Sequence, residues 1–189
     1  MTKLKNYLVL PMVIMSMAWF LSSCSDDDKN TWEKYEDWRE ANTEYFEKQK
    51  FSVDEDGNPL YQTLTPVWNP GTEILIHYFN DRSKTAGNLK PLLTSTVDVK
   101  YRGTLYTGQA FDSSYLQTTW GDSIFRTQIK STIQGWWAAL LDMNVGDSVR
   151  VLIPYNSGYG ASASGAIPPF STLIFDIKLV DIPYYEIKQ

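Results

Sequence analysis

Hydrophobic and polar residues alternate in three segments of the chain, at residues 97–101, 149–153 and 173–179. Successive side chains of a β-strand point to opposite faces of the sheet, so a period of two indicates a half-buried strand. A fourth segment, residues 73–79, is almost continuously apolar and lies between a Pro-Gly turn and a polar stretch. The pattern therefore predicts four strands, with glycine-flanked hairpin turns after the strand at residues 97–101.

Residues 30–50 contain no Pro or Gly and repeat aromatic and small apolar residues every three to four positions. The repeating side chains are Trp32, Tyr35, Trp38, Ala41, Tyr45 and Phe46. This spacing predicts an amphipathic helix. Its apolar stripe could form a dimer seam or dock on the rest of the protein. Docking is the favoured interpretation because the repeat is short for a coiled coil.

A second, shorter helix is predicted between two of the strands. Its apolar face would consist of Ile133, Trp136, Leu140 and Leu141. Ser131 and Thr132 are candidate N-caps, and residues 144–146 should end the helix. Several antiparallel strands around one short helix predict an α+β fold.

The N-terminal residues 1–23 have the pattern of a signal peptide. Lys3 and Lys5 precede an apolar stretch that is shorter than the roughly 20 residues of a membrane-spanning helix and is soon followed by acidic residues. The stretch ends in Leu21-Ser22-Ser23-Cys24, which resembles the lipobox of bacterial lipoproteins, where the cysteine is acylated and becomes the first mature residue. We therefore predict a lipid anchor, such as palmitate, on Cys24; a free cysteine after an ordinary signal peptide is the less favoured alternative.

Removal of residues 1–23 would take away two lysines and no acids, which changes the formal net charge from −5 to −7. Residues 25–28, Ser-Asp-Asp-Asp, are either a solvated spacer or a signal resembling the surface-export signal of some Gram-negative lipoproteins. Both interpretations are open, so the anchored protein could face the periplasm or the cell exterior.

Composition excludes several classes of function. With 43% hydrophobic and 21% charged residues, the chain should fold, and its acidity argues against a nucleic-acid partner. A single cysteine and a single histidine, His77, leave too few ligands for a zinc cluster, and we expect neither metal nor cofactor. His77 lies in an apolar strand and should be structural. Residues 54–59 are expected to form a turn, and the glycines of residues 158–169 lack the lysine of a phosphate loop.

Four blocks in order carry a resemblance to the FKBP-type peptidyl-prolyl isomerases over residues 96–182. They are Val99-Lys100-Tyr101-Arg102-Gly103, Phe111-Asp112-Ser113-Ser114, Ile133-Gln134-Gly135-Trp136, and Tyr159-Gly160 through Ile167-Pro168-Pro169 to Leu173-Ile174-Phe175-Asp176. The resemblance implies a twisted antiparallel sheet wrapped around one short helix, here with an N-terminal helical extension. It also implies rotamase activity on proline-containing polypeptides.

The resemblance further assigns roles to eight residues. Trp136 would form the floor of a proline pocket, Tyr101, Phe111 and Phe175 its walls, and Ile133 and Ile167 its rim. The backbone N–H of Ile133 and the hydroxyl of Tyr159 would hold substrate carbonyls, and Asp112 would either fix the pocket edge or polarise the twisted carbonyl.

The sequence departs from the family pattern at two places near this pocket. An aromatic wall residue of the family aligns best with Ser123, which predicts a thinned wall. The loop before Ile167 is about one residue short and has Ala166 in place of a bulkier residue. Both changes should affect drug affinity more than the fold.

The predicted organisation has three parts: a lipoprotein signal peptide at residues 1–23, an acidic tether with the amphipathic helix and a linker at 24–70, and an isomerase domain at 71–189. The predicted function is a folding helper for exported proteins, held in the cell envelope on a bacterial, most simply outer, membrane. The alternative is a non-catalytic lipoprotein that binds a peptide or partner in the same pocket. The oligomeric state is not predicted.

Overall fold

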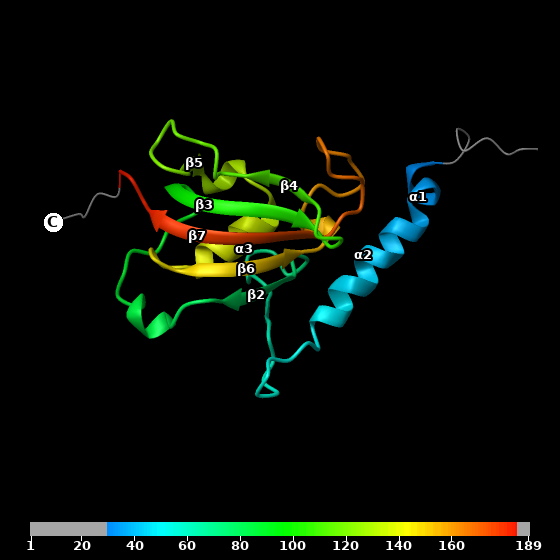
Figure 1. Cartoon of the computed structure of the whole chain (residues 1–189), viewed down its shortest axis with the longest axis horizontal. Helices are drawn as coiled ribbons and strands as arrows, with labels where there is room; N and C mark the ends of the chain where they lie inside the picture. The colour runs from blue at the N-terminus through cyan, green and yellow to red at the C-terminus, as the bar shows by residue number, and fades with distance from the viewer. Residues whose placement is uncertain (1–29, 185–189) are drawn as a thin grey trace, which may run out of the picture.

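The alternating segments form the central strands of a seven-stranded antiparallel sheet in the computed structural model, which describes residues 30–184 (Figure 1). The strand order is β1-β2-β6-β7-β3-β4, and β5 pairs with the first residues of β3. The strands are β1 (Gln62–Leu64), β2 (Ile74–Tyr78), β3 (Thr96–Leu105), β4 (Ala110–Ser113), β5 (Phe125–Gln128), β6 (Ser148–Ile153) and β7 (Leu173–Asp181).

Three helices and three short 3-10 turns complete the described chain. They are α1 (Thr31–Lys34), α2 (Glu36–Gln49), α3 (Gln134–Asp142), η2 (Arg82–Lys84), η3 (Ile129–Ser131) and η4 (Tyr155–Ser157). The α+β class and the four predicted strands are thus confirmed. The predicted signal peptide (1–23), Cys24 and the acidic residues 25–28 lie outside the described residues. Between residues 30 and 184, no helix is long and apolar enough to cross a membrane.

Helix α3 lies against the inner face of the sheet, where the alternating apolar side chains of β2, β3, β6 and β7 form the core. Gly135 makes this approach possible, because a Cβ at this position would collide with the side chain of Ile153 on β6. The start of α3 differs from our prediction. Its N-cap is Ile133, and Thr132 Oγ1 donates backward to the Ile129 carbonyl (2.8 Å). Turn η3 directly precedes α3 and engages the Thr132 hydroxyl, so Ser131 and Thr132 do not cap α3.

The segment before residue 71 contributes to the same structure. Strand β1 pairs with β2, so the sheet begins in the part of the chain that the sequence analysis assigned to a linker. The side chains of Asn69 and Thr72 both donate to Gln134 Oε1, at 3.0 and 3.1 Å. The Asn69 bond ties the end of the linker to the first turn of α3.

The predicted N-terminal helix is present but broken at Tyr35, which separates α1 from α2 (φ −109°, ψ 24°). Helix α2 packs against the end of the sheet and the loop before β7 (Figure 1). Phe46 is 4% exposed and contacts a small cluster with Tyr61, Leu75 and Leu152 on the outer face of the sheet. This arrangement agrees with docking of the helix on the protein.

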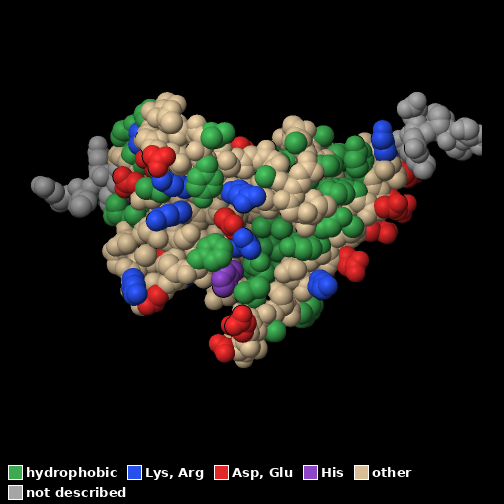
Figure 2. All heavy atoms as spheres, viewed as in Figure 1, with side chains coloured by type: hydrophobic (Ala, Val, Ile, Leu, Met, Phe, Trp, Pro, Cys, Tyr) green, Lys and Arg blue, Asp and Glu red, His purple; other side chains and the backbone are tan. Residues whose placement is uncertain are grey.

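The rest of the outer face carries charged residues in register across four strands. Arg102, Asp176, Arg150 and His77 are successive partners on β3, β7, β6 and β2. Arg150 makes a two-pronged ion pair with Asp176 (2.7 and 2.8 Å), and Figure 2 shows Lys and Arg side chains gathered on this face. His77 Nδ1 lies 2.7 Å from the Leu60 carbonyl oxygen, which gives the histidine a structural place.

Asp147 joins the end of α3 to the sheet and is completely buried. Its carboxylate accepts hydrogen bonds from the Asn144 N–H (2.8 Å), Asn80 Nδ2 (3.0 Å) and the Thr85 hydroxyl, and Arg82 Nε lies 3.8 Å away. Burial by itself would raise the pKa of Asp147. The hydrogen bonds and the Arg82 charge outweigh burial and lower this pKa below its ordinary value of 3.8.

We expect Asp147→Ala to lower the free energy of unfolding at pH 7 by about 2–4 kcal/mol, because three donors lose a buried acceptor. A carboxylate with a lowered pKa stabilises the folded state above its unfolded pKa, and this contribution disappears as the pH falls below 3.8. The difference in free energy of unfolding between wild type and Asp147→Ala, measured with urea, should therefore be smaller at pH 3 than at pH 7. Glu55→Ala, at an exposed turn, is the control; equal gaps at both pH values would contradict the assignment.

Candidate functional site

A cavity of about 360 Å³ lies between α3, the inner face of the sheet and the loop at residues 158–167. It is lined by residues from β3, β4, β5, β7, the start of α3 and that loop. The lining residues are Tyr101, Phe111, Asp112, Phe125, Thr127, Ser131, Thr132, Ile133, Trp136, Tyr159, Ser164, Gly165, Ala166, Ile167 and Phe175. All eight residues to which the sequence analysis gave pocket roles are among them, so the fold brings the predicted set together.

The centre of the cavity is a cluster of aromatic rings in edge-to-face contact. The Trp136 ring lies 5.2 Å from the rings of both Tyr101 and Phe175, at interplanar angles of 83° and 90°. Phe111 stands 5.4 Å from Phe175 at 86°. Such contacts favour a fixed ring geometry beyond simple burial. Trp136, Tyr101 and Phe175 are each 5% exposed or less, so the walls are held rigidly by the core.

Gly103 on β3 is required by this cluster. A Cβ on Gly103 would lie 2.5 Å from Phe111 Cε2 and 2.9 Å from Phe175 Cε1, closer than real Cβ contacts. Gly103 pairs with Phe175 on β7 and with Asp112 on β4, and the register of β3 against β4 shifts directly after it. The absent side chain leaves room for two wall rings to fold over the strand.

The few polar groups of the cavity lie at its edge. The Tyr101 hydroxyl donates to Asp112 Oδ2 at 2.6 Å. Burial raises the pKa of the Tyr101 hydroxyl well above its ordinary value of 10, and the hydrogen bond to Asp112 raises it further. Tyr101 therefore stays a neutral donor, and its bond orients the Asp112 carboxylate at the pocket edge.

Two further hydrogen-bond donors border the opening. Tyr159 lines the cavity and is 40% exposed, so its hydroxyl is accessible at the opening. Ile133 precedes the first turn of α3, where backbone N–H groups have no intrahelical acceptor. Both groups could donate to a ligand that enters the cavity.

One sequence expectation about the walls is wrong. Ser123 does not line the cavity; it has φ +62° and its hydroxyl bonds Asp122. The wall is instead completed by Phe125, whose ring packs 5.5 Å from that of Tyr101. Thr127 and Ser164 line the cavity without having been singled out, and so do Ser131 and Thr132, which were expected only as helix caps.

The cavity offers chemistry of a limited kind. In the described part of the chain, no group of three His, Cys, Asp or Glu side chains is placed to hold a metal ion. An apolar, aromatic cavity with a few donors at its mouth suits a compact apolar ring flanked by carbonyl oxygens. It can remove water from such a group and hold its carbonyls without forming a covalent bond.

Comparison with known proteins identifies similar chains. The family described as FKBP-type peptidyl-prolyl cis-trans isomerase matches residues 87–180. FK506-binding protein 2 of Aspergillus oryzae is 39% identical over 94 residues, which cover 49% of this chain and 69% of the relative. The isomerase FkpA of Escherichia coli K12 is 39% identical over 93 residues, 49% of this chain but only 33% of FkpA. The match therefore spans about a third of the length of FkpA.

Solved structures show the same architecture. A peptidyl-prolyl cis-trans isomerase from Pseudomonas syringae superposes with a TM-score of 0.62 at 28% identity, covering 78% of this chain and 95% of that one. The crystal structure of FkpA from E. coli also gives a TM-score of 0.62, at 27% identity, over 80% of this chain and 62% of that one.

The bond between Tyr101 and Asp112 can be tested by titration. Asp112→Ala removes the acceptor and its charge, so the pKa of Tyr101 should fall toward 10 while remaining above it, because burial is unchanged. NMR of ¹³Cζ-labelled tyrosine would resolve Tyr101 from the other tyrosines. Asp122→Ala, which removes an exposed carboxylate, is the matched control. An unchanged Tyr101 pKa in Asp112→Ala would contradict the described geometry.

Proposed function

Because the chain belongs to the FKBP-type peptidyl-prolyl cis-trans isomerase family, we propose that it isomerises X-Pro peptide bonds in exported or envelope polypeptides. The observation that carries the proposal is the aromatic cavity, which brings together all eight residues of the family pattern. The substrate proline would sit on Trp136, between Tyr101, Phe111 and Phe175, with Ile133 and Ile167 at the rim.

The proposed catalysis requires no nucleophile. Rotation of an X-Pro bond breaks amide resonance, with a barrier of about 18–20 kcal/mol. The twisted amide has less charge separation than the planar amide. A water-free aromatic cavity therefore favours the transition state over the ground state, and the rigid rings of this cavity support such selectivity.

The polar groups at the mouth would position the polypeptide. The Ile133 N–H and the Tyr159 hydroxyl would each donate to a substrate carbonyl. For Asp112, the bond from Tyr101 supports the first of the two roles considered, fixing the pocket edge. In this mechanism the bond to Tyr101 holds the Asp112 carboxylate at the pocket edge through Oδ2. The other carboxylate oxygen, Oδ1, would face the carbonyl of the rotating X-Pro bond.

We further propose that the protein acts in the cell envelope as a lipoprotein. The support is the sequence alone: the apolar leader at residues 1–23 and the lipobox that ends at Cys24. A multiple acyl anchor gains about 0.8 kcal/mol for each buried CH₂ and needs no membrane-binding surface on the domain. In this proposal residues 24–70 form the tether, helix and linker, residues 71–189 form the isomerase domain, and β1 extends its sheet.

Isomerase activity can be tested with the chain that starts at Ser25, on a panel of X-Pro peptides. Gly103→Ala forces Phe111 and Phe175 to move, so kcat/KM should fall more than tenfold, a loss of about 1.4 kcal/mol of transition-state stabilisation. Gly87→Ala is the matched control, because a Cβ there meets no atom within 4 Å. Thermal melts must show that both variants fold. A folded wild type without activity would favour the alternative, a non-catalytic binding pocket.

The lipid anchor has a separate test. In cells grown with labelled palmitate, the wild type should take up label and fractionate with membranes, because the Cys24 thiol is the only acceptor of its kind. Cys24→Ser should lose the label and move to the soluble fraction, with Ser23→Ala as the neighbouring control. Label and membrane association retained in Cys24→Ser would contradict the proposal.

A further inference from the structure

The loop between η4 and β7 forms one side of the cavity, and it has little regular structure of its own. It carries Tyr159, the small residues 164–166 and Ile167 into the pocket before it reaches β7. Its backbone hydrogen bonds are local: Gly160 N–H donates to the Tyr155 carbonyl, Ser162 N–H to the Tyr159 carbonyl and Phe170 N–H to the Gly160 carbonyl, and residues 164 and 167 form an isolated bridge. The position of Ile167 therefore depends on what the loop packs against.

Phe170 shows that the loop is held from outside. It adopts φ +60°, a left-handed conformation that a non-glycine residue keeps only where its surroundings impose it. Its ring is 3% exposed and packs edge-on against Trp32 of α1 (5.4 Å) and Tyr155 (5.5 Å). The Arg39 guanidinium lies 3.5 Å from the centre of the Trp32 ring and 5.7 Å from that of Phe170. The N-terminal helices thus contribute Trp32 and Arg39 to this enclosure.

Helix α2 also makes the hydrogen bonds that fix the end of the loop. Asn42 is completely buried; its Oδ1 accepts from the Thr172 N–H at 2.7 Å, and its carbonyl accepts from the Thr172 hydroxyl at 3.1 Å. Trp38 Nε1 donates to Ser171 Oγ at 3.1 Å, and Ser171 Oγ donates to the Pro168 carbonyl at 2.7 Å. Pro168 directly follows Ile167, so this chain of bonds runs from α2 to the rim of the cavity.

We propose that α2 is a working part of the pocket, with Trp38 and Asn42 as positioning residues that hold the loop bearing Tyr159 and Ile167 in its substrate-binding place. The proposal rests on the isomerase function proposed above and adds to it residues that lie before the family match at residue 87. Neither residue touches the cavity, so both act through Ser171 and Thr172.

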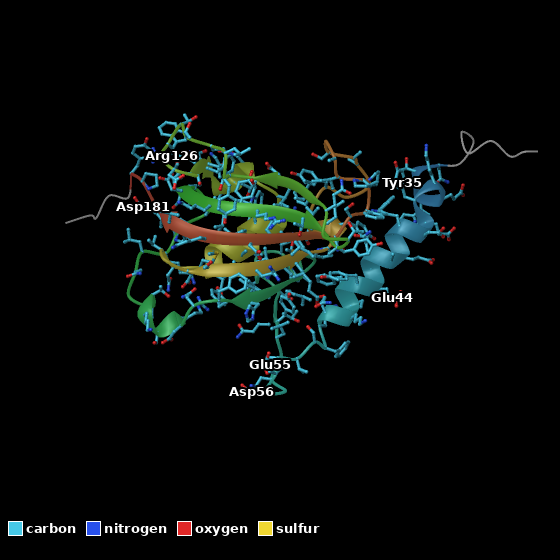
Figure 3. The ribbon with its side chains drawn as sticks, viewed as in Figure 1. Tyr35, Glu44, Glu55, Asp56, Arg126 and Asp181 are labelled. Carbon is cyan, nitrogen blue, oxygen red and sulfur yellow. The ribbon has the colours of Figure 1, made fainter. Side chains whose placement is uncertain are left out.

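The helix itself offers matched controls. The half of α2 that contains Trp38 and Asn42 contacts the loop, whereas Phe46, further along, contacts Tyr61, Leu75 and Leu152 on the sheet. Figure 3 shows Glu44 on the side of α2 that faces away from the sheet. Phe46→Leu should therefore weaken the docking of the helix without releasing the loop, and Glu44→Gln should do neither.

The decisive variants are Trp38→Phe and Asn42→Ala in the chain that starts at Ser25. Trp38→Phe keeps a ring against Tyr106 (5.1 Å) but loses the donor to Ser171. A loosened rim weakens contacts that ground state and transition state share, so KM should rise three- to tenfold while kcat changes less than twofold. Adding Trp38→Phe to Ser171→Ala should change KM little beyond Ser171→Ala alone, because Ser171→Ala already lacks the acceptor of the Trp38 bond.

Hydrogen exchange gives a readout that does not depend on activity. In Asn42→Ala, the Thr172 amide loses its acceptor, so exchange at Thr172 and in the loop at residues 160–171 should quicken more than tenfold. Amides of β6 should keep their wild-type rates. Phe46→Leu and Glu44→Gln should leave both loop exchange and KM near those of the wild type.

The outcomes separate the two proposals. An inactive wild type with faster loop exchange in Asn42→Ala would overturn the isomerase function but not the bracing of the loop. Unchanged KM and unchanged loop exchange in folded Trp38→Phe and Asn42→Ala would overturn the positioning role. An equal rise of KM in Phe46→Leu would also overturn it, since the helix would then act through overall stability. If Asn42→Ala does not fold, the KM and the loop exchange of Trp38→Phe, alone and combined with Ser171→Ala, test the positioning role.

Discussion

The close approach of α3 to the inner face of the sheet is the constraint on which the cavity depends. Gly135 lets the helix touch Ile153 on one side, which buries Trp136 under the strands. On the other side Gly103 leaves space for Phe111 and Phe175 to lean over β3. A side chain on Gly135 would push α3 away from Ile153. A side chain on Gly103 would push the rings of Phe111 and Phe175 out of their places. Two absent side chains thus turn an ordinary apolar core into one with an opening.

The polar groups are distributed so that the walls of this opening do not have to move. The strongest buried polar anchors, Asp147 and Asn42, lie outside the cavity, at the end of α3 and under the loop before β7. At its edge, a short hydrogen bond joins Tyr101 to Asp112, and burial together with this bond keeps the tyrosine hydroxyl neutral. A cavity that works by excluding water needs rigid walls more than reactive groups. Rigidity is supplied here by anchors placed behind the walls.

The parts of the fold with strong periodicity could be predicted from sequence, and the parts defined by tertiary contact could not. Strands β3, β6 and β7 alternate because one face is buried, and the family blocks placed all eight pocket residues. Strand β1 (Gln62–Leu64) is mostly exposed and β5 (Phe125–Gln128) is only partly buried, so neither shows alternation. Phe125 lies in β5, a strand without alternation, so the sequence analysis did not find it as a wall residue. In the sequence, Asn42 is one polar residue next to the aromatic stripe of the helix, and nothing indicates that it is buried. Only the structure shows its hydrogen bonds to Thr172.

The N-terminal helices also set how a lipid anchor would place the pocket. If Cys24 carries the anchor, residues 25–30 could span at most about 22 Å before α1 begins at Thr31. The helices are docked on the loop that borders the cavity, so they cannot act as a free arm that carries the domain away from the membrane. An anchor on Cys24 would then act on helices that are themselves bonded to the loop bearing Ile167.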